Sequence, residues 1–127
     1  MNPFDDAPII HTYTRKQAVE DGEQVDVSEV AREAGIRFPV YLTRTVWGRY
    51  VEVPPKVQGQ DEQGRLWDIL TMFAWQARRA ASDLILFRLY VRNDNRRPRL
   101  VTLKATCGAK DIDDPQPAIT IMLPDED

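Results

Sequence analysis

The sequence predicts an α+β fold: a central amphipathic helix packed on a three-stranded antiparallel meander, preceded by short helices and extended segments. Three observations predict it. The segment Leu66–Ala81 carries apolar residues at helical spacing, and after Ser82-Asp83 the apolar period changes to the alternation of strands. The length of 127 residues, with 43% hydrophobic residues, suits a single domain with one core. We expect residues 1–7 and 124–127 to be flexible.

Short elements fill the first half of the chain. Thr14 and Ser28 are suitable N-caps for two short helices, and Gly35 stands where the second helix would enter the left-handed region. No helix continues through Pro39, because a proline restricts the residue before it. The predicted elements are a strand at Pro8–Tyr13, a helix at Arg15–Glu20, an extended segment at Gln24–Val27, a helix at Glu29–Ala34 and a helix at Thr43–Tyr50.

The helix at Leu66–Ala81 is the longest helical pattern in the chain, and no Pro or Gly interrupts it. Asp61 is its predicted N-cap if Gly64 lies in the first turn. Arg78 and Arg79 near its end suit the helix dipole. Six apolar residues at helical spacing predict one buried face, namely Leu66, Ile69, Leu70, Phe73, Ala74 and Ala77.

The opposite face of this helix carries two tryptophans. At about 100° per residue, Trp75 points away from the buried stripe and Trp67 sits at its flank. One interpretation is that another segment covers Trp75, so that the helix is buried on two sides. The other is a surface for a protein partner, because Trp and Arg are enriched in binding hot spots. The residues of this candidate partner surface are Trp67, Trp75, Arg78 and Arg79.

Three strands are predicted in the last third of the chain. Ile85, Phe87, Leu89 and Val91 alternate with more polar residues and form the first strand, and Asn93–Pro98 is a turn. The remaining predicted elements are a second strand at Leu100–Cys107, a loop at Asp111–Pro117 and a third strand at Ala118–Leu123.

Charge is distributed unevenly along a chain whose formal net charge is −3. Residues 78–110 carry 9 basic and 2 acidic side chains, whereas residues 111–127 carry 6 acidic side chains and no basic one. One interpretation is that the basic block and the acidic tail neutralise each other. The other is contact with nucleic acid or an acidic protein. The candidate nucleic-acid residues on the predicted hairpin 88–104 are Arg88, Tyr90, Arg92, Arg96, Arg97, Arg99 and Lys104.

The chain offers few groups for catalysis. It contains one histidine, His11, and one cysteine, Cys107, and we expect both to be structural. Asp111, Asp113 and Asp114 lack the spacing of a calcium loop, and no phosphate-binding loop is present. We therefore predict no catalytic residue, no metal site and no cofactor. An enzyme built on His11 with carboxylates remains a remote alternative.

The sequence favours a cytoplasmic protein. A single cysteine excludes an internal disulfide. The N-terminal residues MNPFDDAPII carry acidic side chains where a secretory signal has basic ones, and no apolar run approaches the ~20 residues of a membrane span.

Several stretches resemble an uncharacterised family of small bacterial proteins carried on plasmids and integrative mobile elements. They are IHTYTRKQAVEDGEQVDVSEVAREAG, GQDEQGRLWDIL, VRNDNRRPRLVTLKA and ITIMLPDED. The resemblance spans most of the chain and carries no catalytic residues. It implies an accessory protein of a mobile element in a bacterial cytoplasm.

Taken together, we expect a non-enzymatic binding protein with a protein partner, for example an inhibitor of a host defence complex. Nucleic-acid binding by the hairpin 88–104 is the alternative. The oligomeric state is open, a homodimer included.

Overall fold

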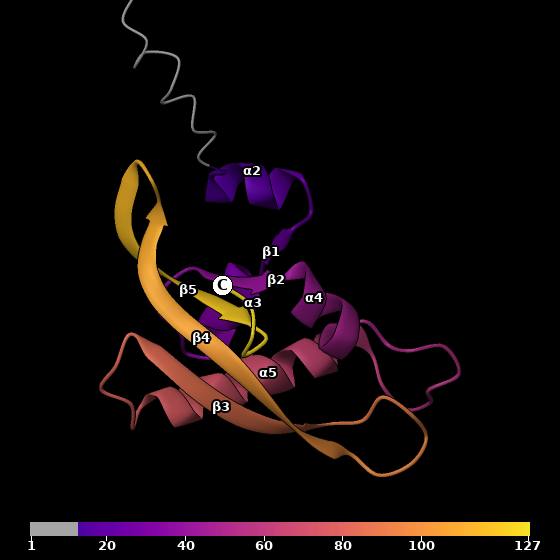
Figure 1. Ribbon diagram of the computed structural model, residues 1–127. Helices are drawn as coiled ribbons and strands as arrows, with labels where there is room; N and C mark the ends of the chain where they lie inside the picture. Colours follow the sequence, from indigo (N-terminus) through magenta and orange to yellow (C-terminus); the bar gives the residue numbers. More distant parts are fainter. Residues whose placement is uncertain (1–12) are drawn as a thin grey trace, which may run out of the picture.

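The computed structural model describes residues 13–127 as an α+β fold (Figure 1). The predicted strand at Pro8–Tyr13, the predicted flexible segment 1–7 and His11 lie wholly or mainly outside this range. The elements are, in chain order, α2 (Arg15–Glu20), β1 (Gln24–Asp26), α3 (Ser28–Glu33), β2 (Val40–Thr43), α4 (Arg44–Val46), the π-helix η1 (Trp47–Val51), α5 (Glu62–Ala77), β3 (Leu84–Val91), β4 (Arg99–Asp111) and β5 (Asp114–Met122).

The strands form one mixed sheet in the order β1-β2-β5-β4-β3. Neighbouring strands are antiparallel except β2 and β5, which run parallel with Val40 opposite Ile119. The predicted three-stranded meander is therefore wrong in extent, because β1 and β2 extend the sheet to five strands. β3 lies at one edge of the sheet and β1 at the other.

α5 packs on one face of the sheet and supplies the centre of the core. Ile69 and Leu70 are fully buried, and Phe73 meets Phe87 of β3 in an edge-on contact with ring centroids 5.4 Å apart. The Asp61 side chain accepts the Gly64 amide, which confirms the predicted N-cap. The helix begins earlier and ends earlier than predicted, since its C-cap is Arg78.

α2 lies beside β1 and the far end of β4, and its Arg15 side chain reaches over β2 and β5 on the other face of the sheet (Figure 1). The Arg15 guanidinium lies 4.3 Å from the centre of the Tyr41 ring and donates to the Thr120 hydroxyl at 3.0 Å. Its Nε donates to the carbonyl of Lys110 at 2.6 Å. A strong multi-point contact of this kind fixes a six-residue helix that is too short to be stable alone. The α2 helix and its Thr14 cap agree with the prediction.

Three local predictions need correction. Ser28 is the first residue of α3 and not its cap, and its hydroxyl donates to Asp26. Val40–Thr43 is a central strand that sequence periodicity did not predict, and the helix after Thr43 changes into a π-turn at Trp47–Val51. The predicted loop at Asp111–Pro117 is largely β-strand, with a tight turn between β4 and β5.

Residues 124–127, predicted to be flexible, include one residue with several contacts. The Glu126 carboxylate accepts the Thr43 hydroxyl at 2.9 Å and the Leu123 amide at 2.8 Å. Its carbonyl accepts the Lys104 ammonium. These bonds hold the acidic end of the chain against β2 and β4.

Candidate functional site

The β3–β4 hairpin leaves one face of the sheet open beyond α2. The cross-strand register pairs Leu86 with Lys104, Arg88 with Thr102 and Tyr90 with Leu100 on this face. Leu86, Arg88, Tyr90 and Leu100 are all exposed. We call this the outer hairpin face. It combines apolar and basic side chains, as the sequence predicted from the alternation along the strand.

The free edge of β3 is partly closed by side chains. The Gln76 amide of α5 donates to the Arg88 carbonyl at 2.6 Å and accepts the Arg88 amide at 3.0 Å. Because the backbone N–H and C=O groups of Arg88 are already hydrogen-bonded, they are not available to pair with an added strand. A ligand is therefore expected on the outer hairpin face rather than along the edge of β3.

The turn between β3 and β4 presents two exposed arginines, Arg96 and Arg97, and the first residue of β4 is a third, Arg99. We call this group the hairpin tip. Arg92 was predicted to share this surface, but it folds back into the turn and donates to the carbonyls of Gln58 and Asp94. Lys104 is half-buried and bonded to Glu126. The structure thus leaves Arg88, Tyr90 and the hairpin tip accessible.

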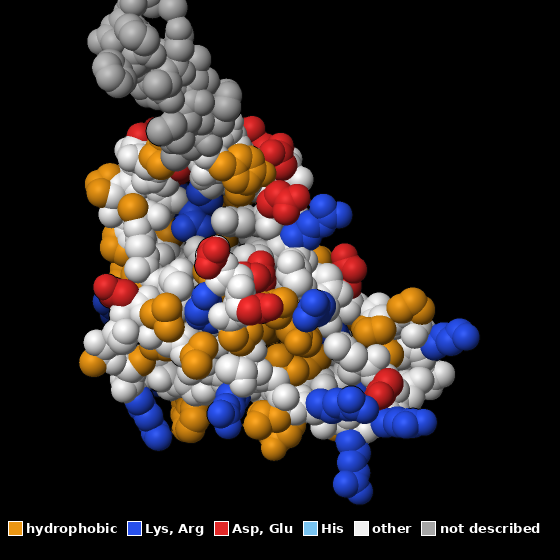
Figure 2. Space-filling model, viewed as in Figure 1, with side chains coloured by type: hydrophobic (Ala, Val, Ile, Leu, Met, Phe, Trp, Pro, Cys, Tyr) orange, Lys and Arg blue, Asp and Glu red, His pale blue; other side chains and the backbone are white. Residues whose placement is uncertain are grey.

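The acidic tail does not form ion pairs with the basic hairpin. Among residues 13–127 the one ion pair joins Arg44 to Glu23 at 3.7 Å, away from the hairpin. The carboxylate of the tail residue Glu126 is bonded to Thr43, and Lys104 of the hairpin donates to the Glu126 backbone carbonyl and not to its carboxylate. Figure 2 shows Lys and Arg side chains along the lower edge of the molecule, over β3 and the turn that follows it, with most Asp and Glu side chains higher. On this face, charge is segregated in space as well as in sequence.

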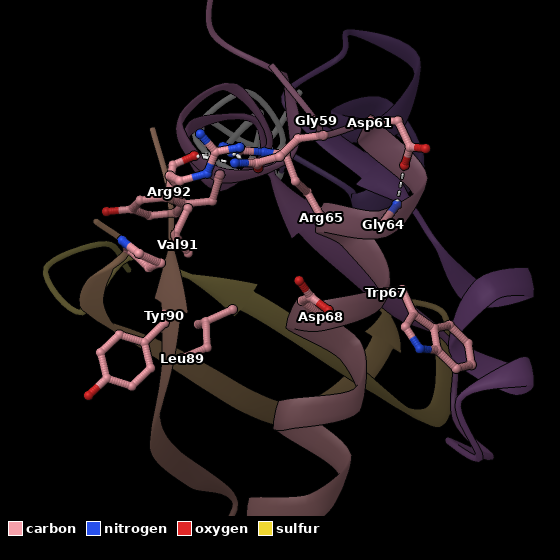
Figure 3. Close-up of a pocket in the computed structure, with 13 residues that line it drawn as sticks. Gly59, Asp61, Gly64, Arg65, Trp67, Asp68, Leu89, Tyr90, Val91 and Arg92 are labelled. Atoms are coloured by element: carbon pink, nitrogen blue, oxygen red, sulfur yellow. Dashed lines mark hydrogen bonds between the residues drawn. The ribbon is translucent and has the colours of Figure 1, made fainter. Parts of the chain in front are cut away.

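A cavity of about 440 Å³ lies beside the hairpin, between the first turns of α5 and the end of β3. Figure 3 shows Asp68 projecting from α5 toward β3, with Trp67 on one side and Tyr90 on the other. Pro98, whose chain neighbours are Arg97 and Arg99, also lines the cavity. The cavity therefore opens next to the hairpin tip. It joins Trp67, predicted for a protein partner, to Tyr90, predicted for nucleic acid.

Arg65 lines one end of this cavity and is only 5% exposed. Its Nη1 donates to Gln60 Oε1 and to the Arg92 carbonyl, both at 2.8 Å. Its Nη2 donates to Asn93 Oδ1 at 2.6 Å and to the Arg49 carbonyl at 3.3 Å. Burial, and then the nearby Arg92 charge, lower the pKa of Arg65. The Arg65 guanidinium therefore links α5 by hydrogen bonds to three chain segments, at Arg49, at Gln60 and at Arg92–Asn93.

The Asp68 carboxylate has no hydrogen-bond or salt-bridge partner within residues 13–127, in contrast to Asp61, which caps α5. Partial desolvation raises the pKa of Asp68 above its ordinary value. An acceptor with no partner beside an open cavity is available to a ligand that brings donors.

The exposed side of α5 carries the predicted partner surface. Trp75 is 54% exposed and Trp67 41% exposed. The Arg79 guanidinium lies 4.8 Å from the centre of the Trp75 ring, within the range of a cation–π contact. Arg78 is also exposed but ends the helix. No segment within residues 13–127 buries Trp75, so the interpretation that the hairpin edge covers it is wrong.

The other candidate groups form no site in the described part of the chain. Cys107 is a half-buried free thiol, and no cluster of three metal-ligating side chains is present within residues 13–127. The Asp111 carboxylate accepts the amides of Ile112, Lys16 and Arg15, which lower its pKa in that order. No helix in this range has the length and apolar character needed to cross a bilayer.

Sequence reasoning missed the cavity and its two central residues. Arg65 and Asp68 occupy polar positions on an amphipathic helix, where such residues are normally solvated. The connector at residues 56–61 and β3 become neighbours of that helix face only in the folded chain. The helical spacing of Asp68 three residues after Arg65 indicated a shared side of α5, but nothing indicated a cavity there.

The chain matches a family of unknown function (DUF6573) over residues 1–127 and belongs to that family. The predicted resemblance to an uncharacterised family is confirmed at that level. No curated protein and no solved structure matches the chain.

Proposed function

We propose that this protein is a non-enzymatic binding protein that holds nucleic acid on the β3–β4 hairpin. The observation that carries the proposal is the exposed hairpin tip, whose three arginines have no carboxylate partner within residues 13–127. Phosphate groups supply that missing negative charge, and releasing their counterions favours binding.

The overall negative charge does not oppose this proposal, because phosphate binding depends on local charge. Lys and Arg side chains gather along one edge of the molecule, over β3 and the turn that follows it, and most acidic side chains on this face lie elsewhere (Figure 2). Tyr90 and Leu100 on the same face offer apolar surface to bases or sugars. A two-stranded ribbon with a basic turn has the dimensions to follow a phosphate backbone.

Replacing Arg96, Arg97 and Arg99 by Ala together should weaken binding to a labelled 20-nucleotide strand by roughly tenfold or more in low salt. The magnitude of the slope of log affinity against log salt should fall by about 2, because each phosphate contact on a single strand contributes about 0.7. Fluorescence anisotropy across a salt series measures both quantities.

The matched control replaces Lys16, Arg32 and Arg37 by Ala. Lys16 lies on α2, Arg32 on α3 and Arg37 shortly after α3; all three are exposed, and their removal changes the net charge by the same amount. Equal weakening by the two triple variants would mean that net charge, and not the hairpin, governs binding. Absence of binding to the parent protein in low salt would also contradict the proposal.

A second candidate function is supported by the Trp75–Arg79 contact. An exposed Trp stacked under Arg is a preformed pair of the kind found in hot spots of protein interfaces. In the setting that the resemblance implies, a bacterial mobile element, the partner would be a protein of the host, such as a subunit of a defence complex. We propose this as a separate surface, since Trp75 and the hairpin tip lie on different elements.

Replacing Trp75 and Arg79 by Ala should abolish capture of a specific partner from a bacterial lysate, because truncating a hot spot typically lowers affinity by a factor of ~30 or more. Quantitative mass spectrometry of the captured proteins is the measurement, and the hairpin-tip variant serves as the control that retains capture. Identical protein sets from the parent and the Trp75–Arg79 variant would reject this candidate.

A further inference from the structure

We infer that the cavity between α5 and β3 holds one unstacked base of a single-stranded nucleic acid, and that the Asp68 carboxylate selects guanine there. The inference deepens the nucleic-acid binding proposed above and rests on it. It assigns a ligand class, single-stranded DNA or RNA, and a residue that determines base preference.

The position of the cavity connects it to the hairpin. Pro98 lines the cavity and stands between Arg97 and Arg99 in the chain. Tyr90 lines the cavity where β3 passes it, and its ring lies on the outer hairpin face. A strand whose phosphates lie on the hairpin tip therefore passes the mouth of the cavity. A base of a single strand can turn out of the stack and enter the cavity. No base pair has to be broken first, because there is no second strand.

The size and lining suit a base. A volume of about 440 Å³ is within the range of roughly 300–1,000 Å³ that holds small ligands. Trp67 precedes Asp68 on α5 and lines the cavity with Tyr50, whereas the Tyr90 ring points away from Asp68 (Figure 3). Aromatic rings stack on any base and favour single strands, whose bases are free to leave the stack.

The selectivity comes from the chemistry of Asp68. An ionised carboxylate only accepts hydrogen bonds, through two oxygens. The Watson–Crick edge of guanine presents two adjacent donors, N1–H and the N2 amino group, which match the two oxygens. Thymine and uracil present one N–H between two carbonyls, which repel a carboxylate. Inosine keeps the N1–H donor of guanine and lacks the amino group, so it isolates one of the two bonds.

The test compares the affinities of the full chain for oligothymidine strands that carry at one internal position dG, deoxyinosine or dT. Fluorescence anisotropy in low salt measures them, and the same series as RNA shows which sugar is preferred. We expect the dG strand to bind about tenfold more tightly than the dT strand, with the inosine strand between them. Pairing the dG strand with its complement should remove the preference.

The Asp68→Asn variant should bind all three strands with nearly equal affinity. Glu62→Gln is the matched control, because Glu62 is an exposed acid of the same helix that does not line the cavity. It makes the same change of charge and should keep the dG preference. Both variants should retain the melting temperature of the parent, since both positions are exposed.

The outcomes separate this inference from the proposal beneath it. Salt-dependent binding with equal affinity for dG, inosine and dT would overturn the base pocket and leave the hairpin proposal standing. A dG preference that survives Asp68→Asn would overturn the role of Asp68. Absence of binding to every strand would overturn both the pocket and the hairpin proposal.

Discussion

Replacing Arg65 by Met should lower the free energy of unfolding by about 2–4 kcal/mol, because buried hydrogen bonds to a charged group contribute about 1.5–3 kcal/mol each and are partly offset by the desolvation of the guanidinium. Met keeps the apolar stem and removes the donors. The side chain of Arg65 bonds the Arg49 carbonyl, Gln60 and the Arg92–Asn93 segment. Its loss leaves acceptors without donors at the base of the hairpin.

Thermal and urea unfolding measure the Arg65 effect, with an expected fall in melting temperature of roughly 10 °C for a domain of this size. Arg65→Lys should recover little stability, since one ammonium cannot reach acceptors on three segments. Arg78→Met is the control, because Arg78 is an exposed arginine that ends the same helix. A stability loss below about 0.5 kcal/mol for Arg65→Met would show that the guanidinium does not hold these segments together.

Replacing Phe87 by Ala should lower the free energy of unfolding by about 3–5 kcal/mol, the usual effect of truncating a buried aromatic residue. Phe87 is fully buried and contacts Phe73 edge-on at 5.4 Å, so the substitution removes this aromatic contact between α5 and β3 and leaves a cavity. Chemical denaturation followed by circular dichroism is the measurement.

Leu86→Ala supplies the control for Phe87, because Leu86 is the adjacent strand residue, points to the opposite face and is 61% exposed. It should change stability by less than about 0.5 kcal/mol. Comparable losses from both substitutions would contradict the assignment of the two faces of β3. Phe87→Leu should lie between the parent and Phe87→Ala, since it restores part of the lost volume.

Local signals in the sequence were sufficient to predict an element where its apolar pattern repeats over many residues or where its cap is clear. The stripe on α5, the Asp61 cap and the alternation along β3 depend on neighbouring residues alone, and all three are present in the structure. The exposed position of the hairpin-tip arginines followed from the same alternation and from the turn. The candidate nucleic-acid surface could therefore be outlined from the sequence, except for Arg92 and Lys104.

Two strand predictions failed for reasons that are not local. Val40, Tyr41 and Leu42 are all buried, because β2 is covered on both faces, so the alternation that marks a half-buried strand is missing. A loop was predicted at Asp111–Pro117, yet its residues from Asp114 on, including Pro115 and Pro117, lie in β5. β2 pairs with β5 only at Ile119–Ile121, so this part of β5 is a sheet edge, where prolines are tolerated.

The sequence by itself determined the α+β class, the central helix with its buried stripe, the hairpin and the separation of charge along the chain. Only the tertiary structure decided where the acidic tail lies, whether Trp75 is covered and that Arg65 and Asp68 meet β3 at one cavity. The physical reason is the distance along the chain over which each interaction acts. Periodicity and capping act over a few residues, whereas ion pairing, burial and cavities depend on side chains brought together from distant segments, such as Arg65 with Asn93 and Thr43 with Glu126.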